Sequence, residues 1–264
     1  IATRMALKLV DYVVTEAGFG TDLGAEKFFN IKCRIAGLRP NAVVIVATVQ
    51  AVKYHGGFNE ENGLGNLAKH IENIRSFGIE PVVAINRFED NTNEEINKII
   101  TFCNSKDIEA ISASHYKDGG EGATDLANSV IRSISKNGKT KFHFSYPLNL
   151  SLQQKIERIA KTIYGADGVD FDRNAETDID LLHRHGYSHL PICIAKTASS
   201  LSDVPNLIGR PKGFRISVNE IRISAGAGFV VVICGNILTM PGLPKFPAAS
   251  RIKVLPDGRA IGLS

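Results

Sequence analysis

The sequence predicts an α/β fold built around a parallel sheet, and three segments carry that prediction. Segments 11–15 and 42–48 have the composition of strands, and 23–36 between them has the spacing of a helix that ends at Gly37. A strand, a helix and a second strand in this order form a βαβ unit, which places ligand-facing loops at the carboxyl ends of the strands. Because 42–48 is apolar throughout, we expect it to be buried on both faces of the sheet.

The same alternation continues along the chain, whose length allows one to two domains. Further strands are expected at 81–85, 110–112, 214–223 and 229–234, the last two joined by a glycine-rich turn at 224–228. Further helices are expected at 66–77, 123–134 and 178–185, and after capping boxes at 92–95 and 151–154. Loops are expected at 58–65 and 115–122, a linker at 136–141, and turns at 240–245 and 256–258.

Composition limits the classes of protein to which the chain can belong. The 264 residues carry a net charge of +4 with both signs interspersed, which favours anionic ligands only mildly. No basic stripe interleaved with aromatic residues is present, so we expect no nucleic-acid partner. We find no apolar run long enough for a membrane and no signal peptide, so we expect a cytoplasmic protein, with a mitochondrion or another organelle as the alternative. Because Ile1 lies inside a helical pattern without an N-cap, we expect an upstream part to be missing.

Cysteine and histidine positions argue against a disulfide framework and a metal centre. The four cysteines are widely spaced in apolar segments and are expected to be buried free thiols: Cys33, Cys103, Cys193 and Cys234. His183, His185 and His189 suggest a metal site, but positions two apart on a helix do not share a face. No acid or cysteine is spaced to complete a ligand shell, so we predict no metal ligands.

A glycine loop at 15–29 is the first candidate ligand site. Gly18 and Gly20 flank Phe19, and Asp22 follows directly before the helix. Small residues let the backbone approach a ligand closely, and the start of a helix offers free N–H groups and a positive dipole end to an anion. Loops of this form between a strand and a helix are also often plain turns, so the pattern alone leaves both interpretations open.

Two further candidates follow the predicted strands. Lys53 and His55, placed after the strand at 42–48, suit a phosphate or a carboxylate, or else Lys53 is a solvated surface charge. Asn86 and Phe88 follow the strand at 81–85, where they suit hydrogen bonding to and stacking on a heterocycle, and Tyr116 is a second candidate ring. The alternatives are a strand-end turn with Phe88 in the core, and a surface tyrosine.

Longer motifs resemble one family, the formate–tetrahydrofolate ligases (10-formyltetrahydrofolate synthetases), over the whole chain. The matching segments are 15–34, 46–57, 65–88, 119–122, 163–169, 190–197, 224–229 and 239–249. The chain looks like roughly the C-terminal half of such an enzyme. The resemblance implies ATP-dependent ligation of formate to tetrahydrofolate through formyl phosphate, with Mg²⁺ and a monovalent cation (K⁺ or NH₄⁺) assisting. It also implies a P-loop-type nucleotide domain followed by smaller α/β domains, and a homo-oligomer, a dimer or a tetramer.

The resemblance also implies roles for individual residues and a division of the chain. The expected positions are Gly18, Phe19, Gly20, Asp22 and Ala47 for nucleotide and formyl phosphate, Phe88, Tyr116 and Asn86 for folate, and Lys53 and His55 for catalysis. The expected division is 1–78 as the C-terminal part of the nucleotide-binding domain, 79–141 as an α/β folate-binding subdomain, and 142–264 as a C-terminal α/β domain.

Departures from the family pattern leave a second hypothesis open. The P-loop pattern Gly-x-x-x-x-Gly-Lys-Thr is absent from this sequence, so we expect this chain alone to be inactive. Gln50 replaces the signature arginine, Tyr116 replaces a tryptophan usual in bacterial members, 198–200 replaces Gln-Tyr-Ser, and the loop after Gly57 is short. The alternative is a non-catalytic or degenerate homologue that serves as a folate-binding or assembly domain.

Overall fold

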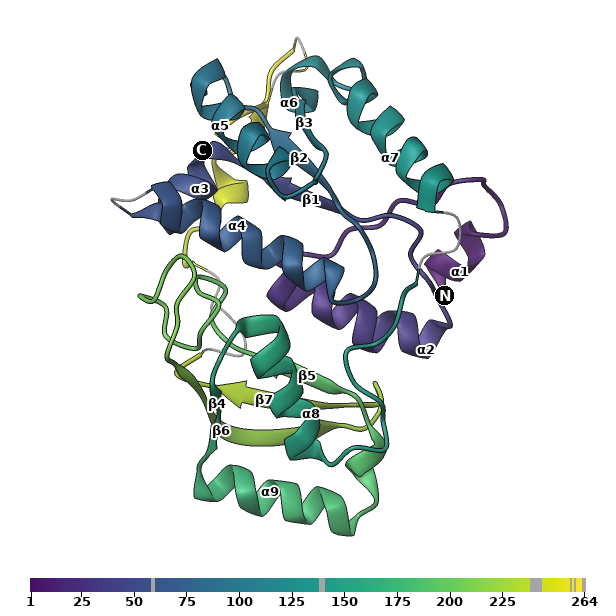
Figure 1. The fold of residues 1–264 in the computed structure, drawn as a ribbon, viewed down its shortest axis with the longest axis vertical. Coiled ribbons are helices and arrows are strands. Elements are labelled where there is room, and N and C mark those ends of the chain that lie inside the picture. Colours follow the sequence, from purple (N-terminus) through teal and green to yellow (C-terminus); the bar gives the residue numbers. More distant parts are fainter. Residues whose placement is uncertain (58–59, 138–140, 238–243, 257, 259, 263–264) are drawn as a thin grey trace.

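The computed structural model describes residues 1–57, 60–137, 141–237, 244–256, 258 and 260–262. Figure 1 shows two main sheets, one in the upper and one in the lower part of the molecule. The first is parallel with the order β1-β2-β3, and the second is mixed with the order β4-β6-β7-β5. The prediction of an α/β fold with a parallel sheet is thereby confirmed. The predicted division at residues 78 and 141 remains a prediction.

The first sheet consists of β1 (Val44–Ala47), β2 (Val82–Asn86) and β3 (Ala110–Ala113). Strand β2 is central and buried on both faces, but β1 is an edge strand and Val46 is 64% exposed. The expectation that β1 is buried on both faces is therefore wrong: Ile45 and Ala47 face the core, whereas the described residues leave the opposite face exposed at Val46. Segment 11–15 forms no strand: it pairs with none of the described strands, and Val14 is exposed. Two adjacent valines without a sheet partner leave their backbone groups to water.

A continuous helical segment runs from Thr21 to Ala36, two residues longer at its start than predicted. It consists of the π-helical turns η1 (Thr21–Ala25) and η2 (Phe28–Cys33), a short α-helical link between them, and α2 (Arg34–Ala36). Gly37 ends it with a φ of +66°, a left-handed conformation that glycine adopts without strain.

Two helices occupy the stretch after β1, where the sequence predicted ligand-facing residues and a polar loop. Helix α3 (Val49–Gly56) begins directly after Thr48, which caps it: the Thr48 hydroxyl accepts a hydrogen bond from Ala51 N at 2.9 Å. Helix α4 (Glu60–Arg75) begins inside the predicted loop 58–65, of which 58–59 lie outside the described residues. A Cβ on Gly63 would overlap the carbonyl oxygen of Val52, so this glycine permits the close crossing of α3 and α4.

The second sheet consists of β4 (Gly168–Phe171), β5 (Ile192–Ala195), β6 (Arg215–Ser224) and β7 (Phe229–Cys234). The turn between β6 and β7 is confirmed, whereas β4 and β5 were not predicted. Helix α8 (Leu152–Ile159) continues into η4 (Ala160–Tyr164), and α9 (Arg173–Arg184) begins five residues before the predicted 178–185 because Asp172 caps it. Both predicted capping boxes, Thr92 with Glu95 and Ser151 with Gln154, are confirmed.

The remaining elements include two longer helices, α5 and α7, and several short ones. They are α1 (Ala2–Ala6), α5 (Asn93–Asn104), α6 (His115–Asp118), η3 (Glu121–Ala123), α7 (Thr124–Asn137), η5 (Tyr187–His189), η6 (Ala248–Ser250), β8 (Lys253–Val254) and β9 (Ala260–Ile261). Segment 115–122, predicted as a loop, is largely helical. Residues 138–140 of the predicted linker, 240–243 of one predicted turn and 257 of the other lie outside the described residues. No described helix has both the length and the apolar character needed to cross a membrane.

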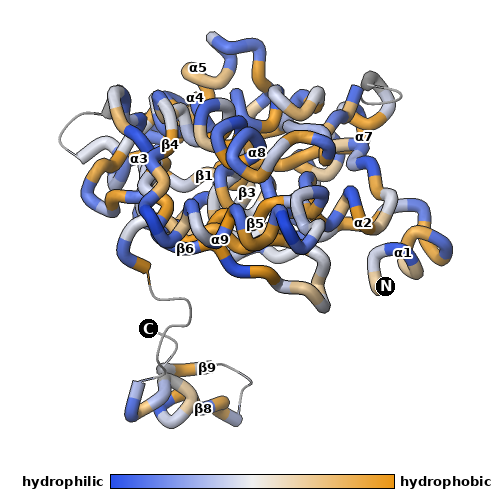
Figure 2. The backbone as a smooth tube through the Cα atoms, turned by 90° about the horizontal axis from the view of Figure 1, so that it is seen from below, coloured by the Kyte–Doolittle hydropathy of each residue, from blue (hydrophilic) through white to orange (hydrophobic). Residues whose placement is uncertain are grey.

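The two sheets share one hydrophobic core. Buried side chains of both sheets belong to a single cluster, which includes Phe29 and Ile71. The Thr21–Ala36 helix and α4 lie between the sheets in Figure 1. Lys69 on α4 donates to the Thr162 carbonyl of η4 at 2.6 Å, which ties the helix to the second sheet. In Figure 2 the small β8–β9 ribbon lies apart from the rest of the described chain.

Candidate functional site

The glycine loop places an aromatic ring in solvent at the start of the Thr21–Ala36 helix. Phe19 is 84% exposed and has a φ of +61°, a conformation that costs a residue with a side chain about 1–2 kcal/mol. Such strain persists only where the surrounding structure determines it, and it occurs often at ligand sites. The exposed ring and the positive φ are consistent with a ligand site, and the ligand role of the loop remains a prediction.

Gly20 and Gly24 are pressed against their surroundings, whereas a Cβ on Gly18 would meet nothing within 4 Å. The Gly18 carbonyl lies where a Cβ on Gly24 would be, so Gly24 lets the loop fold back onto the helix. A Cβ on Gly20 would lie 2.5 Å from Asp22 Oδ1 and 2.8 Å from His70 Cε1. A carboxylate and an imidazole thus occupy the space beside Gly20 that a side chain would need, and the Gly20 carbonyl accepts the first helical bond, from Gly24 N at 2.9 Å.

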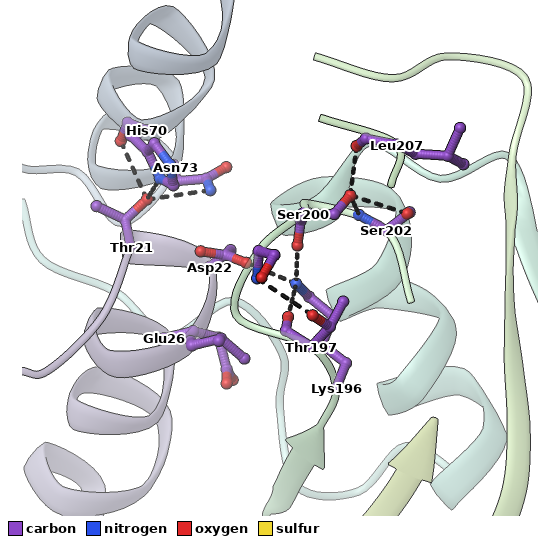
Figure 3. A network of polar contacts seen from close by, with 12 residues as sticks. Thr21, Asp22, Glu26, His70, Asn73, Lys196, Thr197, Ser200, Ser202 and Leu207 are labelled. Atoms are coloured by element: carbon purple, nitrogen blue, oxygen red, sulfur yellow. Dashed lines mark hydrogen bonds and ion pairs between the residues drawn. The ribbon is translucent and has the colours of Figure 1, made fainter. Parts of the chain in front are cut away.

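Helix α4 holds the residue after Gly20 through two side chains (Figure 3). The Thr21 hydroxyl contacts His70 Nδ1 at 2.7 Å and accepts a bond from Asn73 Nδ2 at 3.2 Å. Burial lowers the pKa of His70 despite the charge of Asp22, which favours a neutral imidazole. Sequence reasoning missed His70 and Asn73, which lie one helical turn apart on α4.

The second sheet holds Asp22, which is 5% exposed. Lys196 directly follows β5 and donates to Asp22 Oδ2 at 2.8 Å, as Figure 3 shows. Burial lowers the pKa of Lys196, although Asp22 opposes the shift. The carboxylate of Asp22 is thus committed to an internal ion pair. Lys196 follows a strand at its carboxyl end, the position that drew attention to other residues, but it was missed because β5 itself was not predicted.

A buried acid lies one helical turn beyond Asp22. Glu26 Oε1 accepts a bond from Asn30 Nδ2 at 2.8 Å, while Oε2 accepts none from the described residues and lies 3.7 Å from Lys27 Nζ. Burial raises the pKa of Glu26, which favours the protonated acid. The Tyr164 hydroxyl is also buried without a hydrogen bond from the described residues. The base of the loop is therefore a polar region enclosed by protein.

The other residues expected near the phosphate lie on β1 and α3. Ala47 ends β1 and is buried. Lys53 projects from α3 and forms an ion pair with Glu95, on the first turn of α5. His55 is half-buried, and its Nδ1 accepts a bond from Gly209 N at 3.4 Å. Burial lowers the pKa of His55, which favours the neutral imidazole. Because α3 is a helix, Lys53 and His55 lie beyond the strand end instead of on it.

The expected folate residues do come together. Phe88 and Tyr116 follow neighbouring parallel strands, and their ring centroids are 6.3 Å apart with a 51° tilt. Tyr116 is 79% exposed, whereas Phe88 is half-buried and its N–H donates to Asn91 Oδ1 at 3.0 Å. Asn86 ends β2, and its Oδ1 is buried without a hydrogen bond from the described residues. We call Phe88 and Tyr116 the ring pair.

Comparisons with known proteins identify the family of this chain. A family model described as formate–tetrahydrofolate ligase matches residues 1–264. The chain belongs to the formate–tetrahydrofolate ligase family. A curated formate–tetrahydrofolate ligase from Nocardioides sp. (strain ATCC BAA-499 / JS614) is 48% identical over 276 residues, which cover 100% of this chain and 49% of the relative. The chain therefore spans about half the length of this relative.

Proposed function

We propose that this chain supplies part of the active site of an ATP-dependent ligase that joins formate to tetrahydrofolate, giving 10-formyltetrahydrofolate through formyl phosphate. The observation that carries the proposal is the match of the whole chain to the family. The exposed, strained Phe19 and the ring pair support it, because both are arrangements suited to ligands. ATP, formate and tetrahydrofolate are the proposed substrates.

The proposed division of labour follows from the chemistry of the two steps. Phosphoryl transfer to formate depends on positioning and charge neutralisation, and formyl transfer needs the N10 amine held against the acyl phosphate. The glycine loop, with Gly18, Phe19 and Gly20, forms one wall at the nucleotide and formyl phosphate, with the end of β1 at Ala47 beside it. Asp22 fixes the base of this wall through Lys196.

The ring pair forms the proposed folate platform, but it has to open to accept a planar ring. Carbon atoms in contact lie about 3.5–4.0 Å apart, so a pterin between two rings needs them about 7–8 Å apart. The observed centroid distance of 6.3 Å is shorter, and the tilt of 51° is not parallel. Tyr116 is the exposed partner, and we propose that it turns aside when folate binds, with Asn86 Oδ1 as an acceptor for a pterin N–H group.

Lys53 and His55 are the proposed catalytic residues, and each already has a partner in the structure. Lys53 must leave Glu95 before it can neutralise a phosphate, and neutral His55 must release the bond from Gly209 N before its Nδ1 can accept a proton. The described residues contain no group of three or more histidines, cysteines and acids able to hold a metal ion. Mg²⁺ held by one or two acids and substrate phosphates needs no such group, so Mg²⁺ and the monovalent cation remain predictions and no step is assigned to either.

The degenerate homologue is the second candidate, and Gln50 is the residue that favours it. Gln50 lies on α3, where its side chain donates to Asp90 at 3.2 Å on the protein surface. An arginine at this position would have the same acid within reach. The substitution therefore changes a surface contact and gives the second candidate little support.

One assay tests the proposal directly. The natural full-length polypeptide that contains these residues is supplied with MgATP, formate and tetrahydrofolate, and 10-formyltetrahydrofolate is followed. We expect product formation, and we expect none from the isolated chain of 264 residues, whose sequence has no P-loop lysine to hold the phosphates. Product at the background level from the full-length polypeptide would sink the ligase proposal and leave the folate-binding homologue. The oligomeric state, dimer or tetramer, remains a prediction.

A further inference from the structure

The ion pair between Asp22 and Lys196 joins the glycine loop to the second sheet, although the two residues are 174 positions apart in the sequence. Asp22 lies in the first turn of η1, and Lys196 follows β5. Their side chains are almost completely shielded from water. A charge pair in such a place is costly to form, and removing one partner leaves an uncompensated buried charge. The pair is thus a strong constraint on whatever it connects.

Lys196 is itself held in a fixed position. Its ammonium group has three hydrogens, and it donates to Asp22 Oδ2, to the Thr197 carbonyl at 3.1 Å and to the Ser200 carbonyl. It also lies 4.9 Å from the centroid of the Tyr164 ring, close enough for a cation–π contact. Two of its three hydrogens are thus bonded to carbonyls of the segment that follows β5, and the third is bonded to Asp22.

The Asp22 carboxylate connects Lys196 to the glycine loop. While Oδ2 accepts from Lys196, Oδ1 lies 2.5 Å from the position that a Cβ on Gly20 would occupy. Gly20 directly follows Phe19, whose left-handed backbone needs an external contact to hold it. His70 Cε1 on α4 lies 2.8 Å from the same position, so the Asp22 carboxylate and the His70 ring crowd the same side of Gly20. Asp22 is in turn held by Lys196, from the second half of the chain.

We infer that Lys196 is a positioning residue for the glycine loop, which holds Asp22 against Gly20 and thereby keeps Phe19 in its left-handed, solvent-facing conformation. The identity of the ligand rests on the proposed function, but the geometry of the loop does not. If the loop contacts nucleotide and formyl phosphate, its loss of order raises the KM for ATP and leaves the KM for tetrahydrofolate at the ring pair unchanged.

Hydrogen exchange of the full-length polypeptide tests the loop without relying on activity. In Lys196→Met we expect exchange at Leu23 and Gly24, whose N–H groups donate to the Gly20 carbonyl, to accelerate at least about tenfold. Exchange in strand β2 should stay within about twofold of wild type. The matched control is Lys155→Met, because Lys155 is also buried and donates to two carbonyls without touching the loop. Unchanged exchange in Lys196→Met, or equal acceleration in the control, would overturn the inference.

A double variant distinguishes two effects: the loss of the tether between Lys196 and the loop, and the cost of leaving one buried charge without its partner. Asp22→Asn with Lys196→Met removes both charges, so this protein is expected to fold even if the single variant does not. We expect its loop to exchange at least about tenfold faster than wild type, because the tether is gone. Wild-type protection of the loop in the double variant would overturn the inference.

Kinetics give the second readout in the same proteins. We expect the double variant to raise the KM for ATP at least about tenfold and the KM for tetrahydrofolate by no more than about twofold. An equal rise in both would count against a role at the loop. A wild-type enzyme without ligase activity refutes the proposed function, whereas the exchange measurements decide the role of Lys196 either way.

Discussion

The glycine loop and the ring pair prepare for a ligand in opposite ways. The base of the loop is buried, and it is held by α4 through Thr21 and by the residue after β5 through Asp22. The ring pair follows β2 and β3 and is open to solvent, with Tyr116 exposed and Phe88 anchored by one bond from its N–H to Asn91. The loop is therefore organised without a ligand, whereas the ring pair would have to rearrange to accept a planar ring in the proposed folate site.

The two regions therefore differ in how sensitive their structure is to the loss of a single contact. Holding the strained Phe19 requires buried polar contacts, and each of these is expensive if one partner is lost. The ring pair needs no such support, because stacking on an aromatic ring contributes locally. Damage to the loop should therefore lower both stability and function, while damage to the ring pair should affect ligand binding alone.

Gly24→Ala is expected to have the largest effect and tests the buried side. A Cβ at this position would overlap the Gly18 carbonyl oxygen and lie 2.7 Å from its carbon, and these backbone atoms cannot turn away. We expect the free energy of unfolding to fall by about 3 kcal/mol or more, measured by urea denaturation. Gly18→Ala is the control, because a Cβ there meets nothing within 4 Å, and it should cost no more than about 0.5 kcal/mol. Similar losses in the two variants would contradict the fold-back of the loop.

Phe88→Ala tests the ring pair and should have an intermediate effect. Loss of stacking on one planar ring is worth about 1–3 kcal/mol, so the KM for tetrahydrofolate should rise about 5–150-fold with little change in the KM for ATP. The measurement is steady-state kinetics on the full-length polypeptide. Phe88→Tyr keeps the ring and serves as the control. An equal loss for both substrates, or a Tyr variant as impaired as the Ala variant, would remove the ring pair from the folate site.

Glu26→Gln should have the smallest effect and returns to the buried side. Burial raises the pKa of Glu26 above its ordinary 4.5, so the folded protein binds more protons than the unfolded chain. The contribution of Glu26 is fully present below pH 4.5 and is lost as pH rises through the folded pKa. Glutamine keeps the shape without titrating, so as the pH rises above 4.5 the variant should lose less stability than wild type, measured by thermal unfolding.

The control for this variant lies beside the ring pair. Glu89 is exposed and pairs with Lys117 at 3.3 Å, so Glu89→Gln should leave the pH dependence of stability as in wild type. If Glu26→Gln also shows the wild-type pH dependence, the buried acid is not protonated as its burial requires.

Local signals in the sequence predicted those elements that short-range patterns specify. The two capping boxes were found because the hydroxyl and the acid or amide lie three residues apart, a pattern that needs no tertiary contact. Helix α3 was missed because its N-cap, Thr48, directly follows an apolar strand, and the residues after it were interpreted as a strand-end loop. Strands β4 and β5 are only four residues long and are stabilised by pairing with β6 and β7, far away in the sequence.

The candidate site likewise has features that depend on local sequence and features that depend on contacts between distant segments. The sequence by itself determined the family, the glycine loop and the two rings, because each depends on residue types at short spacings. Only the tertiary structure decided that Asp22 points inward to Lys196 and that Gly20 lies against His70. The physical reason is that a buried ion pair is formed by the packing of two distant segments, and no local pattern in either segment specifies its partner.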